Sequence, residues 1–409
     1  MKCFSSVLPA KCRRREKEHD MSSNQNPDLL IFEPQIAGHR LTWLQYITED
    51  FLHGGFSVSW AVDLRTESKR VIQERLTPRF NGISMISVFD DQNTWRGGSK
   101  INSIAECLKI SRAKYVFVNE LDEVASNVLR KAAVGIYPPA NLKGNLSGVY
   151  FRPRFLSDPL WPPGNVIKAS GFRRLVEQQW FRHIYLVDEY LISSASTHYN
   201  GHFHFLSDPW AGNYLCALPE ARQSISIPAD KFVFLHYGIG DRRKGLHLAV
   251  TVVEKTTPDS RIFLVCAGQN LERSLLKRIE ALEKRGKAKL LNRYISDEEE
   301  RLIFCAADAV LLPYIHHYGS SGVLSRAAAA GKMVIASDEG LLARRVREHD
   351  LGLLFPTNDI NALHECMTAA SALDEERRTQ LQQKLLHYAK TCSREHFRQA
   401  LLAPWHAKN

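Results

Sequence analysis

The segment Gly319-Ser320-Ser321-Gly322 has residue types suited to binding an anion. It comes directly before a short helical stretch, and its two glycines leave the backbone open to a bulky group. Helix starts carry unpaired N–H groups and a partial positive charge, which bind phosphate. The hydroxyls of Ser320 and Ser321 add further donors. The turn is therefore a candidate diphosphate site, although a tight turn capped by Ser321 explains the same residues.

Three cations, Arg242, Arg243 and Lys244, follow the strand-like run that ends at Gly238. They fall where a strand passes into a helix, and basic residues at a helix start oppose the helix dipole. The placement therefore favours an anionic ligand, above all at Lys244. The segment "GIGDRRKG" is not a dinucleotide fingerprint, because Arg243 replaces the third glycine. It is not a phosphate loop either, because it lacks the lysine-then-hydroxyl order.

The first half of the chain carries further candidates. Gly38 and His39 lie between a strand-like run and a helix, where His39 is a donor to an anion, a general base or an ordinary helix-start histidine. Glu120 and Asp122 follow the run "YVFVNEL" and are candidates on the acceptor side, and a solvated acidic helix start explains them equally well. No metal site is predicted, because the paired histidines lack a third ligand at metal spacing. These pairs are His202/His204 and His316/His317.

The elements that position these residues alternate between strand-type and helix-type runs almost from end to end. Apolar runs of this length with helices between them are typical of a buried parallel sheet. The runs are 29–34, 56–63, 82–89 and 115–121 in the first half, then 231–238, 261–268, 288–295, 309–314, 333–337 and 351–355. Double prolines on both sides of 146–155 predict loops that flank this run. The predicted fold class is α/β, with two Rossmann-like doubly wound domains. Ligands bind at the carboxyl ends of strands in such sheets.

A chain of 409 residues exceeds one ordinary core, so two domains are expected. We predict a disordered basic tail at 1–27, a first domain at 28–205, a linker at 206–229 and a second domain at 230–385. Met21 is a candidate alternative start within the tail.

Composition and charge narrow the classes of partner. Hydrophobic residues make up 44% and charged residues 24% of the chain, as in soluble globular proteins, and no apolar run is long enough to span a bilayer. A net charge of +10 favours phosphates, acidic lipid surfaces or nucleic acid as partners. The eight cysteines include no CxxC pair, so neither a disulfide framework nor a zinc site is predicted. A reducing, cytoplasmic compartment is expected.

Three segments together resemble the second domain of GT-B glycosyltransferases, in particular the retaining family 4 group. They are "FLHYGIGDRRKGLHLAV", "LLNRYISDEEERLIFCAADAVLLPY" and "GSSGVLSRAAAAGKMVIASDEGLLARRVREHDLGLLF". The resemblance is strong over about 230–390 and weaker over 28–200, where "AGHRLTWLQYI" resembles the acceptor-side loop. It implies two domains that enclose a cleft, a nucleotide-sugar donor and no required metal. It also implies that the final helix, 386–409, crosses back to the first domain.

The resemblance assigns roles by position. Lys244 matches the lysine that neutralises the donor diphosphate, and Gly319 to Gly322 match the turn against the phosphates and the sugar. Tyr294 and Ile295 fall in the nucleobase loop. Lys244, Arg243 and His39 are the predicted catalytic residues. The remaining predicted donor-binding residues are Gly38, Gly238, Tyr318 and Arg326.

The sequence also departs from the family pattern. Tyr318 and Arg326 replace the two glutamates of the family, and Ile239 replaces an arginine, for which Arg242 or Arg243 is a substitute. An arginine cannot accept a hydrogen bond from a ribose. Arg326 therefore either binds phosphate or pairs with a carboxylate to brace its helix.

The expected function is metal-independent, retaining transfer of a sugar, a hexosyl group above all, from a UDP- or GDP-linked donor to a hydroxyl acceptor, as in polysaccharide biosynthesis. No separate cofactor is expected. The alternative is a catalytically impaired, nucleotide-sugar-binding partner subunit. The expected acceptor is a glycan or a lipid-linked molecule, with no role for nucleic acid. The positive charge fits a peripheral encounter with the inner membrane face.

Overall fold

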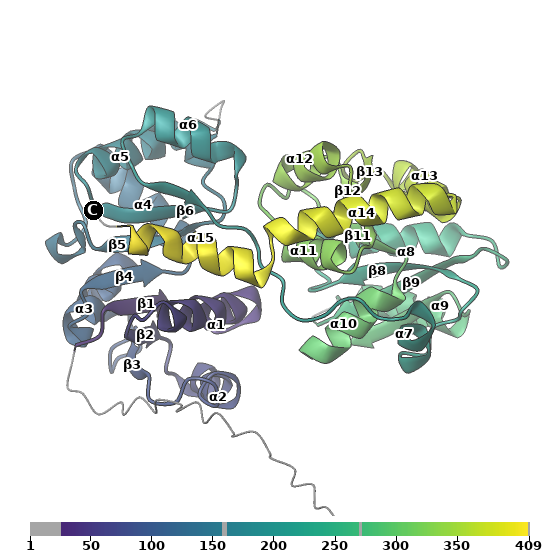
Figure 1. The fold of residues 1–409 in the computed structure, drawn as a ribbon, viewed down its shortest axis with the longest axis horizontal. Helices are drawn as coiled ribbons and strands as arrows, with labels where there is room; N and C mark the ends of the chain where they lie inside the picture. Colours follow the sequence, from purple (N-terminus) through teal and green to yellow (C-terminus); the bar gives the residue numbers. More distant parts are fainter. Residues whose placement is uncertain (1–25, 158–161, 270–271, 408–409) are drawn as a thin grey trace, which may run out of the picture.

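The computed structural model describes residues 26–157, 162–269 and 272–407 (Figure 1). The tail predicted at 1–27, and the candidate start at Met21, fall almost entirely outside these residues. None of the helices in the described ranges is long and apolar enough to cross a membrane.

The first domain is built on a seven-stranded parallel sheet of order β3-β2-β1-β4-β5-β6-β7. Its interior strand β1 is buried at every position, as its apolar sequence Leu-Leu-Ile-Phe predicts. The strands are β1 (Leu29–Glu33), β2 (Val58–Val62), β3 (Ser84–Ser87), β4 (Tyr115–Val118), β5 (Leu146–Tyr150), β6 (Phe181–Leu186) and β7 (Phe203–Phe205). The helices are α1 (Gly38–His53), α2 (Thr66–Arg75), α3 (Lys100–Ser111), α4 (Asp122–Ala133), α5 (Gly164–Glu177) and α6 (Tyr190–His198).

The second domain has a six-stranded sheet of order β10-β9-β8-β11-β12-β13, in which every pair is again parallel. Its strands are β8 (Phe232–Tyr237), β9 (Ile262–Gly268), β10 (Ala288–Asn292), β11 (Ala309–Leu312), β12 (Met333–Ser337) and β13 (Gly352–Phe355). Its helices are α8 (Leu246–Lys255), α9 (Arg273–Lys284), α10 (Asp297–Ala306), α11 (Gly322–Ala329), α12 (Gly340–His349) and α13 (Ile360–Ser371). The predicted class, two doubly wound α/β domains, is confirmed.

Three strands of the first sheet, β5, β6 and β7, are absent from the strand runs predicted from the sequence. The run between the two proline-rich segments was not assigned to a strand, and β5 occupies Leu146–Tyr150, buried throughout. The strands β6 and β7 carry Arg182, His183 and His204 among their apolar residues. These polar side chains interrupt the apolar run that marks a buried strand.

The carboxyl-terminal residues form two helices, and the second of them lies on the first domain as predicted, although it begins at Arg394 rather than at 386. Helix α14 (Glu375–Thr391) packs on α11 of the second domain, and α15 (Arg394–His406) packs on α1 of the first domain (Figure 1). The Arg394 guanidinium donates to Asp50 of α1 at 2.5 Å, and the Trp405 indole donates to Tyr185 at 3.0 Å. The chain therefore crosses between the domains at Cys392-Ser393.

The linker between the sheets is held to the second domain. It contains α7 (Leu218–Ser224), which packs on α10, and the Trp210 indole donates to the carbonyl of Ala389 at 2.7 Å. Cys216 in this linker forms a disulfide with Cys305 of α10. The expectation that no disulfide forms was therefore wrong. The two cysteines lie 89 positions apart, and only the packing of the linker on α10 brings them together.

Candidate active site

The loops that follow β8 and β11 are in direct contact at the carboxyl edge of the second sheet. Gly245 has a left-handed φ of 70°, and a side chain there would meet the carbonyl oxygen of Pro313 at 1.8 Å. The amide of Ile315 donates to the carbonyl of Arg243 at 2.8 Å. The two candidate anion sites of the sequence, one in each loop, are thereby brought together.

Lys244 lies beside the small turn. Its ammonium nitrogen is 3.7 Å from the centroid of the Tyr314 ring, and the Tyr314 hydroxyl lies 3.2 Å from that of Ser321. Ser321 occupies the N-cap position of α11, but its side chain makes no capping hydrogen bond. The interpretation of Ser321 as a helix cap was therefore wrong, and its hydroxyl belongs to the environment of Lys244.

His317 organises the start of the same turn. Arg243 lies 3.2 Å from Nδ1 of His317, and the carbonyl of Ser320 lies 2.9 Å from Nε2. Because the arginine donates and the carbonyl accepts, the ring carries its proton on Nε2. Burial lowers the pKa of His317 to about 4, and the neighbouring charges of Lys244, Arg243 and Arg152 contribute. The ring is therefore neutral at pH 7.

Arg152 brings the first domain to this turn. It follows β5, and a side chain at Gly319 would meet the Arg152 Cγ at 3.3 Å and the carbonyl of Phe151 at 3.6 Å. The glycine therefore permits the approach of a cationic side chain from the other domain. Arg154, two residues further, places its guanidinium 3.8 Å from the ring centroid of Tyr318. The carboxyl edges of the two sheets thus face each other across this boundary.

Three cations from the two domains, Lys244, Arg243 and Arg152, surround the turn. None of them forms a close ion pair with a carboxylate in the described residues. Arg243 lies 3.6 Å from Asp241, whose carboxylate also caps the amide of Lys244 at 2.8 Å. Arg152 lies 3.4 Å from Glu120. In the described part of the chain, no carboxylate is recorded as an ion-pair partner of Lys244. An anion at this place would be held by positive charge from both sides.

Arg326 is engaged by a carboxylate. Its Nε donates to Glu300 of α10 at 2.7 Å, and its NH1 donates to the carbonyl of Gly322 at 2.9 Å. Glu300 also accepts from the hydroxyls of Tyr237, at 2.6 Å, and of Tyr214. Despite its burial, the pKa of Arg326 is raised by Glu300. Of the two roles left open for Arg326, the structure shows the brace.

Tyr318 lies at the boundary between the domains and is 43% exposed. Besides its contact with Arg154, its hydroxyl hydrogen-bonds to Glu339, which follows β12. The same carboxylate accepts from the amide of His316 at 3.1 Å. A carboxylate therefore lies next to position 318, although it is supplied by another loop.

The two predicted nucleobase residues have different environments. Tyr294 is 48% exposed, and the guanidinium of Arg75, from α2 of the first domain, lies 4.2 Å from its ring centroid. Ile295 is 7% exposed and belongs to the core of the second domain. Only Tyr294 presents its side chain at the boundary. Gly238, with φ of 111°, packs its carbonyl against Gly268.

Gly38 and His39 start α1, and both are accessible to solvent. Gly38 has a φ of 56°, and a side chain there would meet no other atom within 4 Å. The His39 ring lies edge-on to Phe151 at 5.8 Å. Desolvation of the part of the ring that contacts the protein lowers the pKa of His39. The negative charges of Asp208 and Glu120 act against this and raise the pKa. His39 therefore lies beside Phe151, the residue that precedes Arg152.

Glu120 and Asp122 are not a solvated acidic helix start. Glu120 is buried and pairs with Arg40 at 2.7 Å. Asp122 accepts from the amides of Phe151 at 2.6 Å and of Arg152 at 3.0 Å. Burial raises the pKa of Asp122 to about 6. Asp122 thus holds the segment that carries Arg152, and Glu120 partly neutralises it.

Sequence reasoning missed Arg152, Glu300 and Glu339. Arg152 follows the apolar run "LSGVY", and the rule that ligands bind at the carboxyl ends of strands points to it once that run is taken as a strand. The sequence around Glu300 and Glu339 does not indicate their roles, because the residues that they bind lie in other elements. No group of three or more His, Cys, Asp or Glu side chains within the described ranges is arranged to hold a metal.

Two parallel sheets whose carboxyl edges face each other define the class of the molecule: it has the GT-B fold of glycosyltransferases. Residues 219–386, which span the second domain, match the family model described as "Glycosyl transferases group 1". No curated protein matches the sequence.

Solved structures with this fold align over nearly the whole chain. HepE from Anabaena, crystallised with UDP, gives a TM-score of 0.65 at 11% identity, covering 93% of this chain and 100% of its own. WaaG, a glycosyltransferase involved in lipopolysaccharide biosynthesis, gives 0.62 at 16% identity, covering 92% and 98%. Sucrose-phosphate synthase from Thermosynechococcus elongatus gives 0.64 at 15% identity, covering 92% and 98%.

Proposed function

We propose that this protein transfers a sugar from a nucleotide-diphosphate sugar to a hydroxyl of an acceptor. The observation that carries the proposal is the convergence of Lys244, Arg243 and Arg152 on the turn that precedes α11. A diphosphate at this turn would meet cations from both domains and the start of a helix. The match of 219–386 to the group 1 family supports the same assignment.

The arrangement suits stabilisation of a leaving group. As the bond between the anomeric carbon and the diphosphate oxygen breaks, negative charge grows on that oxygen, and fixed cations stabilise it. The acceptor oxygen bonds to the same carbon, and its proton passes to the departing phosphate. This route retains the anomeric configuration and needs neither a carboxylate nucleophile nor a metal. We assign His39, at the start of α1 in the first domain, the role of a donor to an anion or of a general base.

UDP is the donor nucleotide that we favour. Its support is the fold shared with HepE, which was crystallised with UDP and with UDP-glucose. The exposed Tyr294 ring is the proposed platform for the base, with Arg75 approaching from the first domain. Glu120 lies on the acceptor side, where its charge balances Arg152.

A second function, a nucleotide-sugar-binding subunit without catalysis, is favoured by a specific observation. Both side chains at the positions of the family glutamates are engaged by protein: Tyr318 contacts Arg154 and Glu339, and Arg326 pairs with Glu300. In this alternative the diphosphate is bound, but the sugar is not positioned for transfer.

Calorimetric titration with UDP, GDP and UDP-glucose, followed by a donor-hydrolysis assay, tests the proposal. Binding of a uridine nucleotide with slow release of UDP from the sugar nucleotide is the expected result. Binding without hydrolysis or transfer to any acceptor would favour the subunit without catalysis. Absence of heat with all three nucleotides would contradict both functions and leave only the fold.

A further inference from the structure

The outward side of two neighbouring helices of the first domain is basic and apolar together. On α4 and the loop after it, Arg130 and Lys131 lie beside Val134, which is 72% exposed, and Ile136, which is 57% exposed. On α5, exposed Arg173 and Arg174 follow two aliphatic side chains, Val166 at 52% and Ile167 at 50% exposure. We call this surface, residues 126–137 and 163–174, the α4–α5 face.

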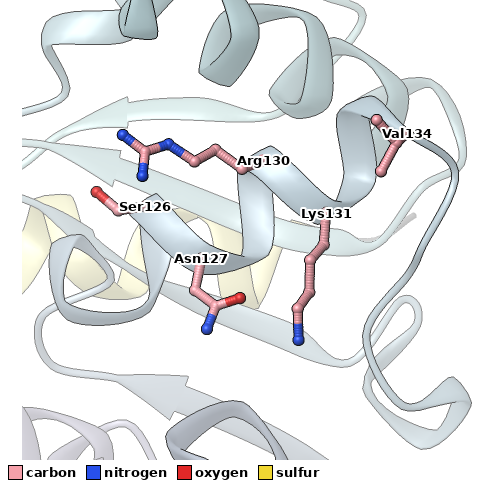
Figure 2. Close-up of a pocket in the computed structure, with 5 residues that line it drawn as sticks. All are labelled: Ser126, Asn127, Arg130, Lys131 and Val134. Atoms are coloured by element: carbon pink, nitrogen blue, oxygen red, sulfur yellow. The ribbon is translucent and has the colours of Figure 1, made fainter.

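The α4–α5 face is a fixed surface, because the two helices are locked together beneath it. A side chain at Gly171 of α5 would meet the carbonyl oxygen of Leu129 at 1.8 Å, so the helix backbones are in close contact. Leu129 and Phe172 are completely buried on the inner side. Figure 2 shows Arg130 and Lys131 extending away from α4 around a shallow pocket that Ser126, Asn127 and Val134 also line. The outward side chains Arg130, Lys131, Arg173 and Arg174 are exposed, and the guanidinium of Arg173 also lies 5.8 Å from the ring centroid of Tyr199.

The charge of this region is one-sided. The α4–α5 face itself, residues 126–137 and 163–174, contains five basic residues and no acidic one, and the only acid of α5 is Glu177 at its end. The two acids at the start of α4 have partners outside the α4–α5 face. Asp122 accepts from the backbone amides of 151–152, and Glu123 pairs with Arg40 and Lys100. The face therefore complements an extended negative surface.

We propose that the α4–α5 face docks the protein on an anionic phospholipid bilayer. Basic side chains near such a surface are attracted by its negative potential, and exposed aliphatic side chains insert at the boundary between headgroups and acyl chains. A soluble anion would use the four cations but would leave the aliphatic side chains in water. Large exposed aliphatic side chains rimmed by charge mark interaction surfaces.

Both helices of the face begin at the carboxyl edge of the first sheet, where the proposed active site lies. Helix α4 begins at Asp122, which holds the segment carrying Arg152. Helix α5 begins at Gly164, and a Cβ added there would lie 3.8 Å from a guanidinium nitrogen of Arg130. A docked molecule would hold its interdomain boundary close to the headgroups. An acceptor hydroxyl on a membrane-anchored lipid would then be within reach, a use of the surface that rests on the proposed function.

Vesicle co-sedimentation tests the docking. The full chain is mixed with vesicles of phosphatidylcholine alone, or containing about one-third phosphatidylglycerol, at low and high salt. The protein is expected to bind the anionic vesicles, and high salt is expected to weaken this binding. The double variant Arg130→Gln/Lys131→Gln should bind about thirtyfold more weakly, because each cation near such a surface contributes a factor of about five.

A matched control and an apolar variant make the test specific. Lys277→Gln/Lys284→Gln, on exposed positions of α9 in the second domain, removes the same charge and should leave vesicle binding within about threefold of the parent. Val166→Ser/Ile167→Ser should weaken the binding that persists at high salt. Unfolding temperatures of all variants are compared to exclude misfolding.

Several outcomes would overturn the docking. These are equal loss in the α9 control, no preference for anionic vesicles, or retention on an anionic polysaccharide column with no vesicle binding. UDP titration of the same preparations keeps the two proposals separate. Vesicle binding without UDP binding contradicts the proposed function alone, and UDP binding without vesicle binding contradicts the docking alone.

Discussion

Lys244 and Arg326 are both basic residues of the second domain, and their neighbours give them opposite roles. Lys244 rests on the face of Tyr314 and has no recorded carboxylate partner in the described chain, so its charge is available to a ligand. Arg326 is tied to Glu300 and, through it, to two tyrosine hydroxyls. The charge of Arg326 is therefore neutralised by Glu300 and stabilises the fold.

Replacing Lys244 by alanine should lower kcat by about two to three orders of magnitude, the effect of removing one fixed donor from a site of developing charge. Steady-state kinetics with the nucleotide sugar checks this. Lys255→Ala, at the exposed far end of α8, is the matched control and should retain full activity. Full activity in the Lys244 variant would place the diphosphate elsewhere.

Replacing Arg326 by methionine should destabilise the second domain, because it leaves the Glu300 carboxylate buried and unpaired. Loss of one partner of a buried pair costs about 3–5 kcal/mol, which corresponds to a fall of roughly 6–20 °C in the unfolding temperature. Differential scanning calorimetry measures this fall.

The double variant Arg326→Met/Glu300→Gln should recover much of that stability, since it removes the charge as well as its partner. If Arg326→Met alone leaves the unfolding temperature unchanged, the pair is not the brace described here. If the same variant abolishes UDP binding without loss of stability, Arg326 acts on the ligand directly.

At the scale of elements, helix α15 closes the first domain over strands that carry histidines. His183 is 7% exposed, and its ring lies 5.1 Å from Trp405 of α15 and 5.3 Å from His204 on the next strand. Neither nitrogen of His183 has a hydrogen-bond partner in the described structure. Burial lowers the pKa of His183 to about 3, with His204, Arg182 and His202 adding to the effect.

The docking of α15 should therefore depend on pH. Burial also lowers the pKa of His204 to about 4, whereas an unfolded histidine titrates near 6.5. Above that pH both states are neutral and these histidines add no pH dependence. As the pH falls from about 6.5 towards 4, the unfolded chain takes up to two more protons, so stability falls. Thermal unfolding as a function of pH measures the slope.

The variant His183→Phe/His204→Phe isolates this contribution from other buried histidines, such as His236. Its unfolding temperature should fall less steeply with acid, whatever its value at pH 7. His198→Phe, an exposed position, should keep the slope of the parent. An unchanged slope in the double variant would show that both rings are already protonated or solvated in the folded state.

At the scale of the molecule, the relative placement of the domains depends on a small set of polar contacts. Arg345 of α12 is 3% exposed, and it donates to the carbonyl of Val187 at 2.6 Å and to Glu189 at 2.5 Å, both in the first domain. Arg344 adds a guanidinium 3.4 Å from the ring centroid of Tyr190. The first-domain residues of these contacts, Val187, Glu189 and Tyr190, directly follow β6 at the carboxyl edge of the first sheet.

Arg345→Ala should loosen this interface and increase the population of open molecules, which small-angle scattering records as a larger radius of gyration. Arg347→Ala is the control, because Arg347 pairs with Asp338 inside the second domain. UDP should narrow the difference if it binds both domains through Lys244 and Arg152. An identical scattering curve for Arg345→Ala and the parent would show that other contacts fix the domain angle.

The sequence by itself determined the two sheets and most of their strands, because a strand buried on both faces must be a continuous apolar run. It also determined which loops carry Lys244 and the small turn, since both lie at carboxyl ends of strands. The strands β6 and β7 were beyond it, because Arg182, His183 and His204 interrupt their apolar runs.

Only the tertiary structure decided how the charges are used. Whether Arg326 binds a ligand or a carboxylate depends on Glu300, which lies 26 positions away on another helix. The partner of Cys216, and the arrival of Arg152 at Gly319 from the other domain, depend in the same way on distant segments. Local sequence fixes the type and position of each group, whereas its pairing is set by which elements pack together, and that is decided by the fold as a whole.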